Sequence, residues 1–536
     1  TPQTSRLSIA RLVCCFFNLM SRDRILLISL LMIILSAFSS CGDKDIAPHP
    51  YEALTKEYFD SLADDAFRTN SQIIRDNIIK IAKKDADGTA AERHTRAHYS
   101  RFSTSPAAFF WIDRHGVSSQ ADTLMACLDS CAKEGVSEKA LRLQRIRDDV
   151  ETVRNLAFSE LQPEDEEINM VFARLEYNLT RAFLKYAVGQ RYGFLNPKQI
   201  LNKLDVRDSD SVTTTYRQLF DIPMHIAGQQ TYYDAMLKIR HDSVGWYLRQ
   251  AMNHSPFYFK LRDCLAKPHL YDRNKVLLNM ERARWQTNER PEGMEDYIVI
   301  NIPAQHLWAV RDGISALDAK IVCGSKETKT PLLYSKVKRM DLNPQWIIPM
   351  SIRKKDVARH AGNAAYFDSR HYFARNKKTG QKLTGKQITW SVITSPDWSV
   401  VQAGGEGNAL GRIIFRFDNN FAVYLHDTSS KHVFSRSLRD VSHGCIRVEK
   451  PYELALFVLK GKDEALAEKI KYSMEADLSL LDCKKSMIVH SIPVEPQLPI
   501  FIIYYTLFSV PGGSIESFPD VYGYDTVMMN ELQKHL

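Results

Sequence analysis

The 536-residue sequence lacks the patterns that mark several broad classes of protein. It contains no nucleic-acid-binding motif. Its net charge of +8 is modest for this length, and we expect the charged residues to be spread along the chain. No self-similar period indicates a repeat protein. The sequence therefore argues against DNA or RNA as a partner and against a solenoid fold.

Cysteine is scarce, with nine residues in the whole chain. No two of them have zinc-ligand spacing, so we expect no metal site, and nothing in the sequence calls for a cofactor. Cys127 and Cys131 are four residues apart on an expected helix, and we favour two small buried apolar side chains over a disulfide. A chain with so few candidate disulfides must draw its stability from apolar cores.

Long apolar runs are also missing, apart from a segment of 14 residues from Ile25 to Phe38. That length is short for a bilayer span, and the flanking Arg22, Arg24 and small residues before Cys41 are typical of an export signal. We expect residues 1–41 to be a signal segment that starts at Met20 and resembles a bacterial lipobox, with a lipid attached to Cys41. An uncleaved membrane anchor is the alternative. Both readings place the body of the chain outside the cytoplasm, in the cell envelope or periplasm.

The remaining sequence predicts an α+β protein with two main parts. Residues 42–54 read as a tether. Residues 55–275 show apolar positions three and four apart and few glycines, which predicts a helical scaffold domain. Residues 290–530 are rich in short β patterns and predict a mostly β catalytic domain.

Local signals within the second part predict individual elements. Strands are expected at 297–302, 307–311, 412–417, 422–425 and 500–505. Asp312-Gly313 predicts a hairpin turn, and Pro451 predicts the start of a helix. Residues from about 350 to 398 are polar, basic and irregular. They indicate an inserted lid, with a solvated surface loop as the alternative.

One short motif carries chemistry. Cys445 follows Ser442, His443 and Gly444, and His426 lies upstream after an apolar strand. A thiol nucleophile needs a base to remove its proton, and glycine allows backbone amides to approach an oxyanion closely. We expect Cys445 to precede a helix whose N-terminal amides would favour its thiolate.

These residues resemble the signature of the L,D-transpeptidases with a YkuD-type catalytic domain: His426, a gap of fifteen residues, then Ser442-His443-Gly444-Cys445. The resemblance extends to the large periplasmic subgroup that carries a helical scaffold domain. Supporting segments lie at residues 280–285, 343–346, 405–411, 424–428 and 520–525.

The resemblance implies a reaction and a set of roles. Cys445 would form a thioester with a peptidoglycan tetrapeptide stem and release D-alanine, and an amine of a second stem would resolve it into a 3→3 cross-link. His426 would be the general base and His443 would tune the thiol or shape the oxyanion site, to which the Gly444 backbone contributes. An L,D-carboxypeptidase or endopeptidase, and a non-catalytic scaffold that binds peptidoglycan, are the alternatives.

Four further residues are candidates for binding the stem peptides: Arg447, Ser442, Arg439 and Tyr424. Stem peptides carry carboxylates, which arginine binds with two parallel hydrogen bonds. For Arg447 the alternative is a structural salt bridge, and for Tyr424 it is core packing. The sequence leaves the oligomeric state open.

Overall fold

The computed structural model describes residues 69–85, 88–100, 109–113, 116–160, 168–209, 214–252, 254–460, 463–476, 483–511 and 513–536. The expected signal segment at 1–41, Cys41 and the tether at 42–54 lie outside these residues. Two compact units can be distinguished. The smaller comprises the described residues within 1–83, 98–118 and 149–176, and the larger those within 84–97, 119–148 and 177–536.

The N-terminal half is helical, as the spacing of its apolar residues predicts. Its main helices are α4 (Ser71–Lys84), α5 (Ala90–Tyr99), α6 (Ser119–Leu128), α7 (Glu138–Leu141), α8 (Leu143–Arg154), α9 (Ile168–Phe183), α10 (Gly189–Tyr192), α11 (Pro197–Leu201), α12 (Gln229–Arg240), α13 (Val244–Ala251), α14 (Pro256–Leu265) and α15 (Arg273–Arg284). Asn196 and Ser255 cap α11 and α14, each followed by a proline in the first turn. Cys127 and Cys131 are both free, and Cys131 is fully buried.

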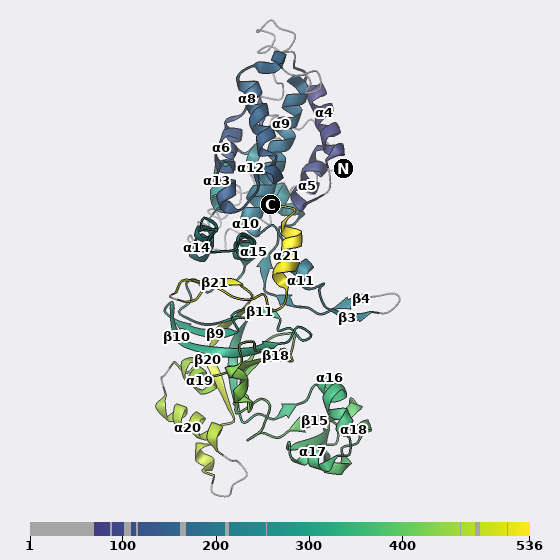
Figure 1. Cartoon of the computed structure of the whole chain (residues 1–536), viewed down its shortest axis with the longest axis vertical. Helices are drawn as coiled ribbons and strands as arrows, with labels where there is room; N and C mark the ends of the chain where they lie inside the picture. The colour runs from purple at the N-terminus through teal and green to yellow at the C-terminus, as the bar shows by residue number, and fades with distance from the viewer. Residues whose placement is uncertain are drawn as a thin grey trace, which may run out of the picture. The chain divides into compact units, whose positions relative to one another are not determined.

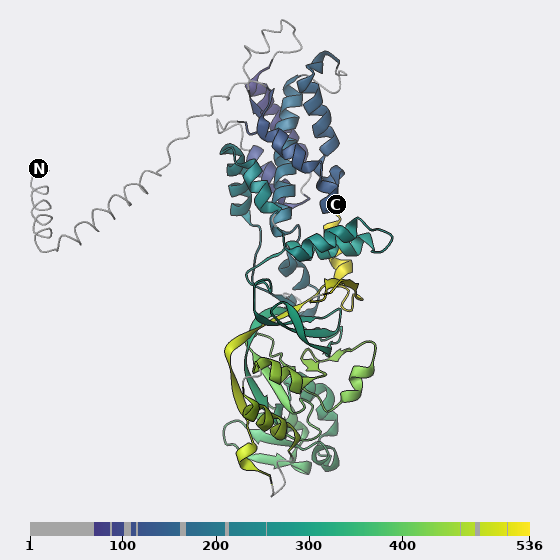
Figure 2. The same ribbon diagram turned by 90° about the vertical axis from the view of Figure 1, so that its left-hand side faces the viewer.

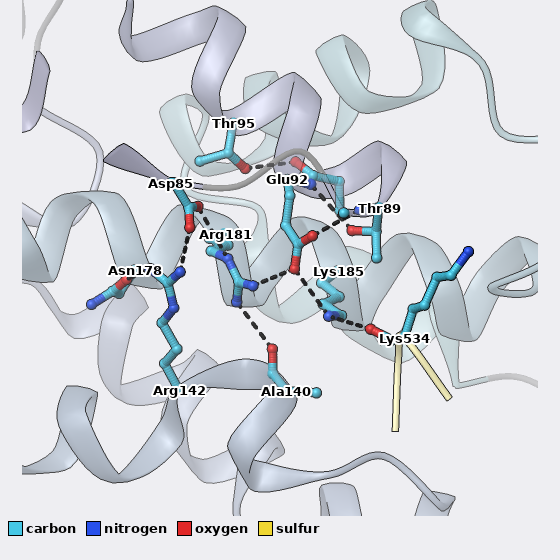
Figure 3. A network of polar contacts seen from close by, with 12 residues as sticks. Asp85, Thr89, Glu92, Thr95, Ala140, Arg142, Asn178, Arg181, Lys185 and Lys534 are labelled. Atoms are coloured by element: carbon cyan, nitrogen blue, oxygen red, sulfur yellow. Dashed lines mark hydrogen bonds and ion pairs between the residues drawn. The ribbon is translucent and has the colours of Figure 1, made fainter. Parts of the chain in front are cut away.

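A buried polar network lies within the helical part of the larger unit (Figure 3). Glu92 accepts hydrogen bonds from Arg181 and, at 3.1 Å, from Lys185. Lys185 also donates to the backbone carbonyl of Lys534 at 3.2 Å. Because all three charged side chains are less than a tenth exposed, the ions are compensated by one another and not by water.

The C-terminal half contains a ten-stranded sheet. Its longest path runs β16 (Ile413–Phe417), β17 (Leu425–His426), β19 (Ile446–Val448), β10 (Ile314–Gly324), β9 (His306–Arg311), β8 (Asp296–Asn301), β20 (Ser491–Ile503), β11 (Leu332–Leu342) and β5 (Phe220–Asp221). A further pairing of β11 with β16 closes the path into a barrel. Strands β9, β10, β11 and β20 are labelled in Figure 1, and β20 is the long yellow strand in Figure 2.

Alternation along each strand builds the core of this barrel. In β8, Ile298 and Ile300 belong to the main core, whereas Val299 packs on the opposite face with Phe501. The turn between β9 and β10 has positive φ at both Asp312 (51°) and Gly313 (75°), as a tight two-residue hairpin requires. Pro451 begins helix α19 (Pro451–Val458), so both local predictions are confirmed.

The segment expected to be irregular between 350 and 398 is folded. It forms α16 (Met350–Ile352), α17 (Ala364–Asp368), α18 (Trp390–Thr394), β13 (Tyr372–Asn376), β14 (Lys382–Thr384) and β15 (Trp398–Gln402), with β12 (Trp346–Ile347) pairing β15. In Figure 1 these elements gather as a cluster around β15. Apolar side chains scattered among the polar ones supply a separate core, which includes Phe367, Ile388 and Val400. A solvated loop is therefore the wrong reading.

No helix in the part of the chain that the structure describes is long and apolar enough to cross a membrane.

Candidate active site

Cys445 lies in a turn between two strands, β18 (Asp440–Ser442) and β19. The helix after it, α19, begins only at Pro451. The expectation that Cys445 stands at a helix N-terminus was wrong, because β19 intervenes and the effect of a helix dipole fades within about one turn.

Hydrogen bonds fix the shape of this turn. Gly444 has a φ of 110°, which only glycine adopts without strain. Its N–H donates to Ser442 Oγ at 3.2 Å, and that hydroxyl donates to the Cys445 carbonyl at 2.6 Å. Thr330 Oγ1 donates to the Gly444 carbonyl at 2.9 Å. Ser442 Oγ therefore positions the turn, and a role of this residue in substrate binding stays a prediction. The Gly444 amide, already bonded, is not a free oxyanion donor.

Strand pairing places His426 and Arg447 on one face of the sheet. β17 and β19 are parallel neighbours, with Leu425 opposite Ile446 and His426 opposite Arg447. Leu425 and Ile446 are fully buried in the main core. Since side chains alternate along a strand, His426 and Arg447 lie on the other face. Tyr424 and Cys445 directly precede the two strands and pack in part against the main core. Cys445 thus stands directly before β19, beside the parallel strand that carries His426.

His426 is held as a neutral base. Its Nδ1 contacts the backbone carbonyl of Asp427. A carbonyl only accepts hydrogen bonds, so Nδ1 carries the hydrogen and Nε2 keeps its lone pair. Burial, followed by the charge of Arg447, lowers the pKa of His426 to about 4, against the weaker influence of the Asp427 and Leu410 carbonyls. His426 belongs to β17 itself and does not follow a strand at 422–425 as expected.

Asp427 in turn is fixed by its surroundings. Its carboxylate accepts hydrogen bonds from the Arg412 amide, at 2.8 Å, and from Lys431. Gly411 packs so closely that a Cβ there would lie 2.4 Å from the Asp427 carboxyl carbon. The backbone next to His426 therefore has one well-defined position.

The resting thiol of Cys445 is protonated. Burial raises its pKa to about 11, although the Tyr424 backbone and Arg447 lower it. The Sγ–H points to the Ala422 carbonyl at 3.9 Å, within range for sulfur. The structure favours a neutral thiol beside a neutral imidazole, in place of the thiolate that the helix argument predicted.

Arg447 is a half-buried cation without a partner. Its Nε is buried and has no hydrogen-bond acceptor among the described residues, and no carboxylate among them contributes to its pKa. The alternative of a structural salt bridge is therefore not realised. Burial lowers the pKa of Arg447, and the Cys445 sulfur is the group that opposes this. A buried guanidinium beside a nucleophile is suited to bind a carboxylate.

The remaining candidates have different environments. Arg439 is buried and donates to three backbone carbonyls, those of Ile321, Arg436 and Gln305, which gives it a structural role. Its assignment to substrate binding stays a prediction. His443 is exposed. The Tyr424 ring lies 6.1 Å from the His426 ring, and burial raises the pKa of its hydroxyl to about 12.

Sequence reasoning missed the residues that support the site from a distance. Thr330 lies 114 positions from Gly444, and no local pattern connects them. Asn408, fully buried, donates to the carbonyls of Pro344 and Ala403 and accepts from the Leu410 amide. Asn408 and Asp427 lie in the segments 405–411 and 424–428 that support the family resemblance, but the resemblance assigned neither of them a role.

Two further features of the described residues concern metal ligands and cavities. They contain no group of three or more His, Cys, Asp or Glu side chains arranged to hold a metal ion. A cavity of about 330 Å³ is lined mainly by apolar and aromatic residues such as Phe257, Trp285 and Phe501, and Cys445 is not among them.

Comparisons with known proteins match both halves of the chain. Residues 295–468 match the YkuD family, described as the L,D-transpeptidase catalytic domain, and residues 103–265 match a family described as the Scaffold domain. A curated protein of Haemophilus influenzae, named "Putative L,D-transpeptidase", is 31% identical over 252 residues, which are 47% of this chain and 48% of that protein. The chain thus spans about half the length of this relative.

Two solved structures are also similar to it. The Ldtfm–avibactam carbamoyl enzyme has a TM-score of 0.20 at 14% identity, covering 46% of this chain and 62% of that one. A Cys-to-Ser mutant of the Enterococcus faecium L,D-transpeptidase has a TM-score of 0.18 at 14% identity, covering 46% and 64%. On the two family matches, the chain carries a Scaffold domain followed by an L,D-transpeptidase catalytic domain of the YkuD family.

Proposed function

We propose that this protein is a peptidoglycan L,D-transpeptidase that forms 3→3 cross-links through a thioester on Cys445. The observation that carries the proposal is the position of Cys445 directly before β19, at the Gly444 turn, with His426 on the parallel neighbour β17 and opposite Arg447. The family match of the catalytic domain and the name of the Haemophilus influenzae relative support the same class of activity.

The first half-reaction follows from the neutral pair. His426 Nε2 takes the proton from the Cys445 thiol as Sγ attacks the carbonyl that links the L-centre of the third stem residue to D-alanine. A Sγ–C bond forms, and the C–N bond breaks. The departing D-alanine amine takes the proton from His426, which returns to its neutral state. A general base is needed here because the thiol pKa of about 11 leaves little thiolate at neutral pH.

The second half-reaction reverses the roles. An amine of a second stem attacks the thioester, gives a proton through His426 to sulfur and leaves an amide cross-link. Water in place of the amine would give L,D-carboxypeptidase activity from the same acyl-enzyme. Among the backbone donors of the turn, we assign the N–H of Cys445 to the developing oxyanion, and Arg447 binds a stem carboxylate.

Turnover of purified muropeptides tests this proposal. The full chain is incubated with disaccharide tetrapeptides, and products are identified by mass spectrometry. Wild type should release D-alanine and form dimers, Cys445→Ala should do neither, and Cys483→Ala, which removes another free and partly exposed thiol, should match wild type. Shortened monomers alone would establish the carboxypeptidase instead. If the protein turns over no muropeptide and Cys445 forms no adduct with a carbapenem, the remaining hypothesis is the non-catalytic scaffold that binds peptidoglycan.

We also propose that the protein works in the cell envelope, in the periplasm, as a lipoprotein anchored at Cys41. A peptidoglycan substrate and the export-like segment at 1–41 support this location. Cys41→Ser should shift the protein of fractionated cells from the membrane to the soluble envelope fraction. An unchanged membrane fraction would contradict lipidation at this residue.

A further inference from the structure

The positive charge of the chain is not spread evenly. Residues 346–402, which we name the basic subdomain, contain ten Lys and Arg and three Asp and no Glu, a formal net charge of +7, whereas the whole chain carries +8. About a tenth of the sequence thus holds nearly all of the net charge. This corrects the expectation of a charge distributed along the chain.

Nine of these ten cations are on the surface of the subdomain. They are Lys354, Lys355, Arg359, Arg370, Arg375, Lys377, Lys378, Lys382 and Lys386, and every one is exposed. Within the described residues, none of the nine belongs to a salt bridge, in contrast to surface cations elsewhere such as Arg147 and Lys534. The charge is therefore available to an anionic partner.

The tenth cation, Arg353, is buried and links separate segments of the subdomain. Arg353 is 3% exposed and donates to the carbonyls of Val392, Ser395 and Trp398. Around it, Phe367, Ile388 and Val400 form a core that is distinct from the barrel core. The exposed lysines are thus displayed on a frame that does not depend on them for its packing.

Aromatic side chains lie among these cations. Trp390 opens α18 with 64% of its surface exposed, which is unusual for a tryptophan. The Arg370 guanidinium covers the Tyr366 ring at 4.2 Å, and Lys382 lies over Phe373 at 4.4 Å. The surface therefore offers both charge and flat apolar area.

The basic subdomain is tied to the backbone that leads to His426. Gln402, at its last strand, donates to the carbonyls of Arg370 and Gly407 and accepts from the Ala409 amide. Asn408 then holds the Leu410 amide, and Gly411 packs on Asp427. A short, hydrogen-bonded connection therefore joins the basic subdomain to Asp427, the residue that follows His426.

We propose that the basic subdomain is a docking surface for the peptidoglycan polymer, which it binds through the carboxylates of several stem peptides at once. This rests on the proposed function, because it takes the substrate polymer as the occupant. Charge complementarity selects that occupant: stems carry free carboxylates, and a repeating polymer presents many of them to nine cations. The surface adds affinity for polymer and leaves the chemistry at Cys445 unchanged.

The test uses the full chain and two variants with equal loss of charge. The docking variant carries Lys354→Gln, Lys355→Gln, Lys377→Gln and Lys378→Gln. The matched control carries Lys133→Gln, Lys139→Gln, Lys267→Gln and Lys485→Gln, four exposed lysines outside the subdomain. Co-sedimentation with purified insoluble sacculi is measured from 50 to about 300 mM NaCl, and turnover is measured on soluble disaccharide tetrapeptide.

Wild type and the control should bind sacculi alike, with binding that weakens as salt screens the charges. The docking variant should bind on the order of tenfold more weakly, with a smaller salt dependence. Wild-type protein should not bind sacculi whose carboxylates have been amidated. Turnover of the soluble tetrapeptide should be equal in all three proteins.

Equal binding by the docking variant and the control would overturn the inference. So would wild-type binding that survives amidation of the sacculi. Preferential binding of wild type to vesicles of phosphatidylglycerol over sacculi would assign the surface to a membrane and also overturn it. Absence of wild-type turnover on soluble tetrapeptide would count against the proposed function instead, while the sedimentation result would still decide the docking surface.

Discussion

At the scale of single residues, the Cys445 thiol and the His426 imidazole are both uncharged in the resting site. Burial raises the pKa of the Cys445 thiol to about 11 and lowers that of His426 to about 4. Between these values both groups are neutral, so proton transfer must accompany attack. The motif predicted which residues meet but not their protonation, because desolvation depends on neighbours that are distant in the sequence.

The pH dependence of alkylation follows from the raised thiol pKa. Because iodoacetamide reacts with the thiolate, modification of Cys445 should stay slow at pH 7 to 8 and accelerate toward pH 11. Peptide mapping of alkylated protein across this range measures it, with Cys483 as the internal comparison. A midpoint below the ~8.5 of a free thiol would instead establish a thiolate–imidazolium pair.

At the scale of elements, two connecting segments determine the geometry of the site. The turn at 443–445 is held from the loop after β10 by Thr330, and the segment at 403–412 is held by Asn408. Strands, the hairpin at Asp312-Gly313 and the helix at Pro451 were predictable, since each depends on local sequence. The hydrogen bonds of Thr330 and Asn408 were not predictable, because nothing in the local sequence distinguishes these residues from others of the same type.

Gly411→Ala tests the support of His426. Gly411 has a φ of 63°, and a Cβ would lie 2.4 Å from the Asp427 carboxyl carbon, so Asp427 and the adjoining His426 must shift. We expect kcat to fall by on the order of 10²-fold, because a displacement of a catalytic group by about 1 Å has an effect of this size.

Gly407→Ala is the matched control for this change. Gly407 also has a positive φ, of 73°, but open space at its Cβ position. It should lose only about 1–2 kcal/mol of stability from backbone strain and keep its kcat. Equal kcat in the two variants would remove Gly411 from the positioning of His426.

Thr330→Val tests the support of the nucleophile turn. The change leaves the Gly444 carbonyl and the Gly324 amide without their hydroxyl partner. Loss of about 1–3 kcal/mol in the free energy of unfolding is expected, together with a lower kcat. Urea denaturation and muropeptide turnover measure both, and Thr330→Ser, which keeps the hydroxyl, should restore them. Failure of the serine variant to do so would show that the methyl group matters more than the hydrogen bonds.

At the scale of the whole molecule, the α+β architecture was predictable from periodicity, whereas the folded basic subdomain was not. Its core residues are separated by polar stretches, so no apolar period marks them. The buried polar network of the helical part was also not predictable from the sequence pattern. Glu92, Arg181 and Lys185 resemble surface residues in sequence and are buried in the structure (Figure 3).

Glu92→Gln should be strongly destabilising. It leaves Arg181 and Lys185 as buried cations with reduced compensation, which costs about 3–5 kcal/mol. Glu138→Gln, which removes an exposed partner of Arg147, should cost at most about 1 kcal/mol. Urea denaturation of both variants measures the difference, and similar values would contradict the buried network.

The same network has a pH signature. Burial tends to raise the pKa of Glu92, but Arg181, the Thr89 amide and Lys185 together hold it below the ordinary 4.5. A carboxylate with a lowered pKa stabilises the fold above its unfolded value and loses that contribution as pH falls through the folded value. Wild type should therefore lose more stability than Glu92→Gln on acidification below pH 4.5. Parallel pH profiles would contradict this.

The most direct test of the account is to locate the acyl group. Wild-type protein is quenched in acid within the first turnovers on a tetrapeptide muropeptide, digested and mapped by mass spectrometry. The account predicts a tripeptide-stem adduct on the peptide that contains Cys445, labile to hydroxylamine as a thioester is, and its absence from Cys445→Ala. Product formation with no adduct on Cys445, or with the same adduct in Cys445→Ala, would contradict the central claim.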